Sequence, residues 1–334
     1  MILSKLNFCS LAFASLFLLF TTSAALAEVV VSSVAPRQGQ VIEVTVKEPS
    51  GSAEPGSAGV QPASESSSAQ AGSAGSSPSS KPGAAAVSPA SRSSSTSACP
   101  PDAAPHVVNF NDCSYRLFPS GKDANGLLSL RALIGIPADL KPGKYKLVYG
   151  ADAVDIAVKD GKFPLQYLRL PPGKDNFLMS PGEKEAVEGA KATCSNQRLW
   201  RGVFLAPSKF RTSAAFGLKR VVNGKLLNDY FHSGLDFAAP MGSTISACAA
   251  GKVVLAKTGF RLHGNIVGID HGQGVISFYL HMSKIAVKNG DEVKAGQKIG
   301  AVGQTGRATG PHLHFSIYVN QVATNPREWF NRSF

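Results

Sequence analysis

Five side chains that could bind a metal ion or transfer protons lie in three short segments of this 334-residue chain. The segments are His232-Ser-Gly-Leu-Asp236, Tyr279-Leu-His281 and His312-Leu-His314. Imidazole and carboxylate groups are the usual protein ligands of zinc, and a hydrolytic zinc site uses three of them together with a water molecule. The set supplies three such ligands and leaves two histidines for proton transfer, which predicts a hydrolytic metal site.

The elements expected to position these side chains are β-strands. His312 and His314 lie in the largely apolar run Gly310–Tyr318, and residues i and i+2 of a strand share one face. Both imidazoles are therefore expected to point into one cavity. His281 directly follows a second apolar strand, Val275–Leu280. Each spacing also arises by chance, so the settings of the motifs carry more weight than any motif taken singly.

From about Trp200 to Trp329 the chain resembles the LytM/lysostaphin-type zinc metallopeptidases, bacterial enzymes that cut peptide bonds in peptidoglycan. The motifs that carry this resemblance follow one another in the family's order. They are Phe216-Gly217, His232–Pro240, Gly251-Lys-Val, Ile269-Asp-His-Gly272, Tyr279-Leu-His281, Gly290–Gly303, Thr305-Gly306 and His312-Leu-His314-Phe. The resemblance implies a compact antiparallel β domain with a groove for an extended peptide and with the metal ligands on its floor.

The resemblance also implies a role for each of the five residues. Those that match His232, Asp236 and His314 bind zinc, so one Zn2+ per chain is the expected cofactor. Those that match His281 and His312 stay off the metal and serve catalysis as general base and oxyanion stabiliser, and which of the two does which is left open. The sequence contains no His-Glu-x-x-His motif, and none is needed when Asp236 is a ligand.

The remaining histidines and one tyrosine are expected to be structural. His271 lies in the turn-like Asp270-His-Gly-Gln-Gly, where glycines favour a turn residue over a catalytic one. His263 either lines the substrate groove or is structural, with the second reading favoured. Tyr279 is expected to pack in the core rather than to donate to an oxyanion. His106 has no partner evident in the sequence.

The function that the resemblance implies is an exported zinc metalloendopeptidase that hydrolyses peptide cross-links of peptidoglycan, with the peptide stems as its substrate. A DD-endopeptidase acting on directly cross-linked stems is favoured over cleavage of glycine bridges by family analogy alone. Two alternatives belong to other classes. Some relatives lack ligands and activate wall amidases without being enzymes, and the chain could also be a wall-binding module.

The first 27 residues read as a secretory signal. Lys5 is followed by an apolar stretch and then by Ala25-Leu-Ala27 before Glu28, which predicts cleavage after Ala27 and export to the periplasm or cell envelope. The stretch is short for a membrane span. The chain is therefore not expected to be an integral membrane protein unless the signal stays uncleaved.

A small β-sandwich, Ig-like in character, is expected from residues 28–48 together with 106–172. Alternating apolar residues and turn signals recur in both segments. Residues 49–105 consist largely of Ser, Ala, Gly and Pro, a composition that buries too little apolar surface to fold. They are expected to form a long disordered insertion in the sandwich.

A connecting helix is expected within residues 173–198, followed by the LytM-like peptidase domain at 199–334. Ser180–Ala192 begins with a serine and a proline and continues with acidic residues, which predicts a helix with Ser180 as its N-cap. Short strands with glycine punctuation recur from Leu199 onward. The predicted fold class is thus mainly β: an antiparallel β-sheet metallopeptidase domain preceded by the small sandwich.

The net charge of +12 is concentrated in the C-terminal part, where residues 196–334 hold 17 Lys and Arg against 6 Asp and Glu. A basic surface suggests an anionic partner. Because export removes the chain from nucleic acid, an anionic cell-wall or membrane surface is the partner considered. A solvated surface that aids solubility is the equal alternative.

Four cysteines follow the apolar stretch: Cys99, Cys113, Cys194 and Cys248. An even number suits an oxidising compartment, and four cysteines allow three pairings. The pairing Cys99–Cys113 with Cys194–Cys248 is preferred because each pair would stay near its own domain. The alternative for Cys248 is a buried small hydrophobe without a disulfide.

Overall fold

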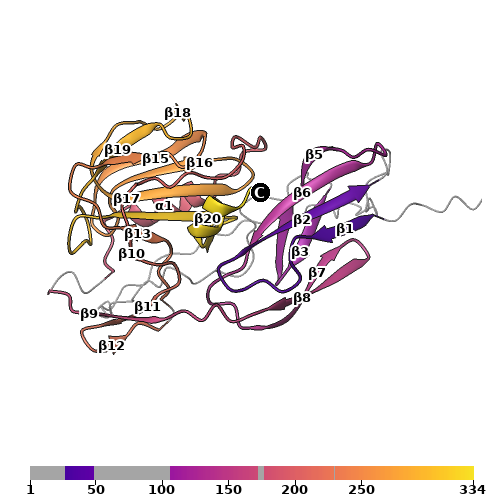
Figure 1. Ribbon diagram of the computed structural model, residues 1–334, viewed down its shortest axis with the longest axis horizontal. Helices are drawn as coiled ribbons and strands as arrows, with labels where there is room; N and C mark the ends of the chain where they lie inside the picture. Colours follow the sequence, from indigo (N-terminus) through magenta and orange to yellow (C-terminus); the bar gives the residue numbers. More distant parts are fainter. Residues whose placement is uncertain (1–26, 49–105, 172–176, 229) are drawn as a thin grey trace, which may run out of the picture.

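The computed structural model describes residues 27–48, 106–171, 177–228 and 230–334 (Figure 1). The predicted signal at 1–27 and the predicted insertion at 49–105 therefore fall outside the described residues, apart from Ala27. The elements are overwhelmingly β-strands, paired antiparallel with one exception. The predicted mainly β, antiparallel fold class is confirmed.

Two four-stranded antiparallel sheets form the N-terminal part. The first has the order β1-β2-β6-β5, and the second β4-β3-β7-β8. Their bounds are β1 Glu28–Val31, β2 Val41–Glu48, β3 Val107–Phe110, β4 Cys113–Arg116, β5 Phe118–Lys122, β6 Leu128–Gly135, β7 Gly143–Tyr149 and β8 Asp152–Val158. β2 pairs with β6 over eight residues, so chain segments on either side of residues 49–105 lie in one sheet.

One apolar core lies between these two sheets. Side chains alternate between buried and half-buried along β2, which is the period of a strand with one face inward. Ile42 and Val44 from the first sheet meet Phe110, Leu147 and Ile156 from the second, and all five are almost fully buried. The arrangement is two sheets packed face to face. β4 and β5 form strands although their short runs carry little apolar periodicity.

The C-terminal part is built on a ten-stranded sheet. Seven strands follow the order β10-β13-β20-β17-β16-β15-β18, and β14, β19 and β21 pair beside this path. Their bounds are β10 Thr212–Ala214, β13 Leu235–Phe237, β14 Thr244–Ser246, β15 Gly251–Phe260, β16 Gly264–Asp270, β17 Val275–Ile285, β18 Glu292–Val293, β19 Lys298–Val302, β20 Leu313–Val319 and β21 Val322–Thr324. Trp200, Phe204, Tyr279, Phe315 and Trp329 fill its main core.

β9 (Leu165–Leu168) does not join the N-terminal sheets, although residues 106–172 were expected to belong to the sandwich. It pairs in parallel with β11 (Lys219–Val222), which also pairs with β12 (Lys225–Leu226). Leu165 and Tyr167 are exposed, so this strand brings little buried apolar surface to a sandwich core. Its backbone hydrogen bonds are satisfied by β11 instead.

α1 (Glu183–Lys191) packs on one face of the large sheet. Val187 and Ala190 contact the apolar cluster that includes Ile266 and Phe278. The helix lies where one was expected, but the prediction of Ser180 as its N-cap is wrong. The N-cap is Gly182, in the left-handed region at φ 74°, with no side-chain cap. Ser180 instead donates from its hydroxyl to the Glu183 carboxylate.

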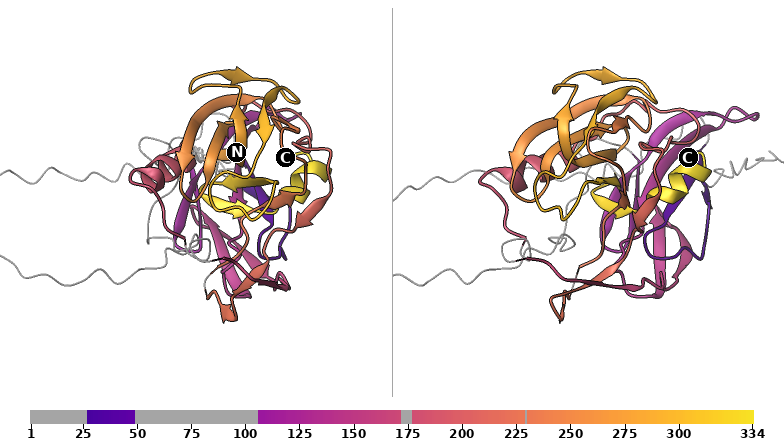
Figure 2. Two further views of the ribbon diagram at one scale, coloured as in Figure 1. Left: turned by 90° about the vertical axis from the view of Figure 1, so that its left-hand side faces the viewer. Right: turned by 60° about the vertical axis from the view of Figure 1, so that its left-hand side comes forward.

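The N-terminal sheets are docked firmly against the large sheet. Arg131 on β6 donates to Gln273 at 3.1 Å in a buried contact, and Asn320 donates to the Leu133 carbonyl at 2.8 Å. Val41 and Leu133 belong to the core of the C-terminal part. α2 (Pro326–Asn331) lies at this junction, where Glu328 accepts from the backbone N–H of Val41. Figure 1 shows the two halves side by side with the yellow helix α2 between them, and the right-hand view of Figure 2 shows α2 beside the indigo and magenta N-terminal strands.

The predicted Cys194–Cys248 disulfide is wrong. Cys248 is a buried thiol between the buried Ala247 and Ala249, and burial raises the pKa of this thiol to about 12. The alternative reading, a small buried hydrophobe, describes it. Cys194 is itself disulfide-bonded. Cys113 is a thiol, so the predicted Cys99–Cys113 disulfide is wrong as well.

Across the parts of the chain that the structure describes, no helix combines the length and apolar character needed to cross a membrane.

Candidate active site

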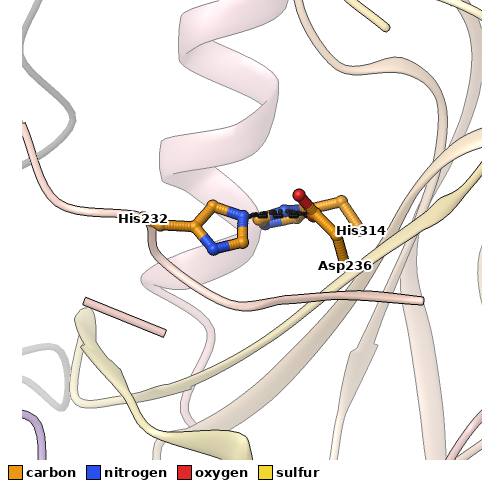
Figure 3. A group of neighbouring side chains, drawn as sticks. All are labelled: His232, Asp236 and His314. Atoms are coloured by element: carbon orange, nitrogen blue, oxygen red, sulfur yellow. Dashed lines mark hydrogen bonds and ion pairs between the residues drawn. The ribbon is translucent and has the colours of Figure 1, made fainter. Parts of the chain in front are cut away.

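His232, Asp236 and His314 meet in a triangle of ligand atoms (Figure 3). The Asp236 Oδ1 lies 3.1 Å from His232 Nε2 and 2.9 Å from His314 Nδ1, and the two imidazole nitrogens are 3.1 Å apart. β13 and β20 are paired in the sheet with Asp236 opposite His314. His232 comes from the segment before β13. Residues 78 positions apart are thus brought together by one strand pair.

This triangle fits a single metal ion. Three ligand atoms at zinc-like bond lengths around a tetrahedral ion lie about 3.3 Å from one another, close to the separations observed. The Nδ1–H of His232 donates to the Ala215 carbonyl at 2.7 Å. This bond leaves the Nε2 lone pair directed at the triangle, which is how an outer partner orients a ligating imidazole.

The charge state of the triangle also suits a metal ion. Burial on its own would raise the pKa of the Asp236 carboxyl, but the charges and hydrogen bonds of His232 and His314 hold it well below the usual range. Burial lowers the pKa of His314 to about 4, against the opposing effect of Asp236. At neutral pH the carboxylate is ionised and the His314 ring is neutral, and these are the forms that bind metal.

Arg220, which sequence reasoning missed, contacts the second oxygen of Asp236. Its Nη2 lies 3.7 Å from Oδ2, its Nη1 donates to the Tyr230 hydroxyl at 2.8 Å, and its Nε donates to Gln166 at 3.1 Å. The side chain is 12% exposed. Nothing in the short strand β11 distinguished this arginine from a solvated one, because its partners come from β9 and from the segment before His232.

His281 and His312 lie together beside the ligand triangle. Their ring centroids are 4.8 Å apart, and the His312 Nε2 lies 4.0 Å from Asp236 Oδ1. Each ring donates from Nδ1 to a backbone carbonyl at 2.9 Å, His281 to Thr305 and His312 to Gly310. The Nδ1 bond leaves Nε2 as the basic nitrogen of a neutral ring.

The backbone of His281 is in the left-handed region at φ 62°. A non-glycine residue in that region is strained, and such strain gathers at functional sites. The register of β17 against β19 shifts just after it, between Met282 and Lys284. Burial, together with the neighbouring His312 and His314, lowers the pKa of His281 well below its ordinary value. This ring is therefore neutral at neutral pH.

All five residues line one cleft of about 1390 Å³. Residues 137–141 of the N-terminal part, α1 and residues 320–323 line the same cleft. The docked N-terminal sheets therefore supply part of its wall. A cleft of this size with convergent polar groups at one place is the usual form of a ligand site.

The other histidines and Tyr279 lie outside the ligand triangle, and each is held by a contact to another part of the protein. His271 is fully buried and donates from Nδ1 to the Ala250 carbonyl at 2.8 Å. The Tyr279 hydroxyl accepts from the Cys248 backbone N–H inside the core. His263 lines the cleft and is also held by Glu183 at 2.7 Å. His106 contacts the Tyr149 hydroxyl at 3.0 Å.

The fold and the site together define a mainly β metalloprotein with a His-Asp-His ligand group. Residues 230–326 match peptidase family M23. A crystal structure of a putative peptidase M23 from Pseudomonas aeruginosa shares 31% identity with this chain, covers 67% of it and 87% of its own length, and superposes with a TM-score of 0.50. The chain belongs to peptidase family M23.

Curated relatives match shorter stretches. The peptidoglycan DD-endopeptidase ShyC of Vibrio cholerae is 42% identical over 137 residues, which is 40% of this chain and 30% of ShyC. The DD-carboxypeptidase/endopeptidase Mpg of Neisseria meningitidis is 43% identical over 95 residues, 28% of this chain and 22% of Mpg. The chain spans about a third or less of the length of the curated relatives that it matches.

Proposed function

We propose that this protein is an exported zinc metalloendopeptidase that hydrolyses peptide cross-links of peptidoglycan, acting as a DD-endopeptidase. The observation that carries the proposal is the convergence of five side chains in one cleft: three buried ligand atoms within 4.8 Å of one another, and two histidines beside them. The membership in peptidase family M23 adds the reaction class.

In this proposal His232, Asp236 and His314 hold one zinc ion through Nε2, Oδ1 and Nδ1. Zinc, when bound, supplies the Lewis acidity that activates water and polarises a scissile carbonyl. Asp236 contributes the one negative charge of the ligand set, and Arg220 holds its second oxygen away from the other two ligands. The Ala215 carbonyl keeps the His232 ring in the required tautomer.

His281 and His312 are assigned jointly to proton transfer and transition-state stabilisation. Each ring is anchored through Nδ1, so each presents Nε2 as the working nitrogen. One ring accepts the proton of the attacking water at Nε2. The other, protonated at Nε2 as well as at Nδ1, donates a hydrogen bond to the developing oxyanion and passes its Nε2 proton to the leaving amine. The proton taken from water by the first ring is then released to solvent, and the second ring takes one up again.

The substrate assignment is supported by the curated relatives, whose names include peptidoglycan DD-endopeptidases. The large open cleft suits an extended peptide stem, and the basic C-terminal part suits the anionic wall around it. Export is a proposal that depends on the signal-like residues 1–27. An amidase activator without enzymatic activity is disfavoured because all five positions hold competent residues.

Digestion of purified sacculi tests the proposal. The full chain with zinc should release peptide-cleaved muropeptides, while a chelator should silence it and added zinc should restore it. His314→Ala should be inactive while its circular dichroism spectrum stays that of the folded protein. Cleavage by the His314→Ala protein at the wild-type rate would refute the assignment.

A further inference from the structure

The carboxylate of Glu183, outside the site just described, accepts an unusually large number of hydrogen bonds. Glu183, the first residue of α1, is fully buried and accepts six hydrogen bonds. The donors are Ser180 N and Oγ at 2.7 and 3.0 Å, Arg261 N and Leu262 N at 3.0 Å, and His263 N and Nδ1 at 2.9 and 2.7 Å. Burial on its own would raise the pKa of this carboxyl, but the bonds from His263 and Ser180 lower it strongly. The group is a buried anion.

Three of these donors are consecutive backbone N–H groups, in the turn at residues 261–263. Successive N–H groups of a turn form a concavity that holds an anion. The turn joins β15 to β16, and Gly264 at its end has φ 70°. The conformation of this turn is therefore fixed by a side chain from a helix about 80 residues earlier in the sequence.

The turn holds the backbone of His281. The His263 carbonyl accepts from the His281 backbone N–H at 3.1 Å. His281 is the site residue with the left-handed backbone, a conformation that persists only where surrounding contacts enforce it. The bond from His263 is one of those contacts.

The turn also holds the ring of His281, through the loop that joins β19 to β20. The Leu262 carbonyl accepts from the Arg307 backbone N–H at 3.0 Å, and Thr305 in that loop accepts from His281 Nδ1 at 2.9 Å. The two loops touch closely: a Cβ added at Gly264 would lie 2.4 Å from Thr305 Oγ1. A displacement of the turn would therefore be passed to the loop.

We propose that Glu183 is a positioning residue for His281, fixing both its backbone and its ring through the turn at 261–263. The inference rests on the proposed function, in which His281 transfers protons. Glu183 touches neither the ligand triangle nor a reacting atom. It also lies outside residues 230–326, the stretch matched by the family. α1 thus belongs to the working part of the enzyme.

Glu183→Gln in the full chain tests the proposal. Glutamine keeps the volume but turns an NH2 group toward a set of donors, so the turn loses acceptors. Glu185→Gln is the matched control, because Glu185 is exposed on the same helix. Hydrolysis of a purified cross-linked muropeptide and zinc content per chain are measured for all three proteins.

The expected result for Glu183→Gln is a kcat about 10-fold to 100-fold below wild type. Its KM should stay within about twofold, and its zinc content should remain near one per chain, because the ligand triangle is untouched. Glu185→Gln should match wild type. A Glu183→Gln protein with wild-type kcat, or one whose kcat falls only in step with its zinc content, would overturn the proposal.

A second variant and a second measurement allow the proposal to be tested even if Glu183→Gln does not fold. If Glu183→Gln does not fold, Glu183→Asp replaces it: the shorter carboxylate keeps the charge, and kcat should fall with KM and zinc unchanged, whereas wild-type kcat would overturn the proposal. Hydrogen exchange of the His281 amide should be faster in the Glu183 variant than in wild type and Glu185→Gln. The exchange rate can be measured without catalytic turnover, so the two hypotheses are tested separately. A wild-type protein that does not cleave the substrate would contradict the proposed function. An unchanged exchange rate of the His281 amide would contradict the positioning role of Glu183.

Discussion

The imidazole rings of His281 and His312 lie 4.8 Å apart, tilted by 48°, and each is anchored at Nδ1 by a backbone carbonyl. Neither ring belongs to the ligand triangle. His281 lies in β17, and His312 immediately precedes β20, which pairs with β17. Metal binding and proton transfer are therefore separable, and variants should divide into two groups.

The first prediction concerns that division. His281→Ala and His312→Ala should each keep about one zinc per chain and lose about 100-fold to 10,000-fold in kcat, because a general acid or base is removed while the ligands remain. Metal analysis and kinetics on a cross-linked muropeptide measure both quantities. Loss of zinc in either variant would show that the ring is a ligand after all.

The second prediction concerns the charge of the ligand set. Asp236→Asn keeps the shape of the side chain but removes the only negative ligand, so zinc affinity should fall by more than about 100-fold. Competition with a fluorescent zinc chelator measures the dissociation constant. Asp155→Asn, on an exposed carboxylate of β8, is the control and should bind zinc as wild type does.

The third prediction links metal to stability. Zinc that binds only the folded protein should stabilise it by about 2.7 kcal/mol at a free concentration 100 times the dissociation constant. Thermal unfolding with zinc and with chelator should therefore give different midpoints for the wild type. His314→Ala should give the same midpoint in both conditions. Equal midpoints for the wild type at saturating zinc would mean that the folded state offers no such site.

The fourth prediction concerns pH. Burial lowers the pKa of His271 to about 4 from an ordinary value of 6.5, so between these values the unfolded chain binds the proton and the folded chain does not. The neutral buried ring of His271 therefore contributes about 3 kcal/mol to the free energy of unfolding above pH 6.5. This contribution is lost as the pH falls through 4. Urea unfolding of metal-free wild type and His271→Gln measures it.

The free energy of unfolding should fall more steeply between pH 7 and pH 4.5 in the wild type than in His271→Gln. His314 and His281 also have lowered pKa values, but they are common to both proteins and cancel in the comparison. Parallel pH profiles would contradict a neutral buried His271.

Much of the site was predictable because its chemistry restricts residue type. His232, Asp236 and His314 stand out in the sequence since few side chains bind zinc. The period of two in a strand predicted that His312 and His314 would face one cavity, and both line the cleft, although β20 begins only at Leu313. The strong strands were predictable for the same reason: β2 and β7 carry alternating apolar residues with turn signals beside them.

The missed features depend on partners that are distant in the sequence. Arg220 and Glu183 look like ordinary surface charges until Asp236 and the turn at 261–263 are brought beside them. Cys248 was assigned a disulfide from its sequence position, yet it lies in a buried apolar run. β9 was placed in the wrong sheet because its sequence shows that it is a strand but not where its hydrogen bonds go.

Mass spectrometry of the soluble products released from purified sacculi is the most direct check on the zinc peptidase assignment. Zinc-loaded full-length protein should yield muropeptides cleaved at the peptide cross-link, and His314→Ala under the same conditions should yield none. Intact cross-links after incubation with the zinc-loaded wild type, or identical products from His314→Ala, would contradict it.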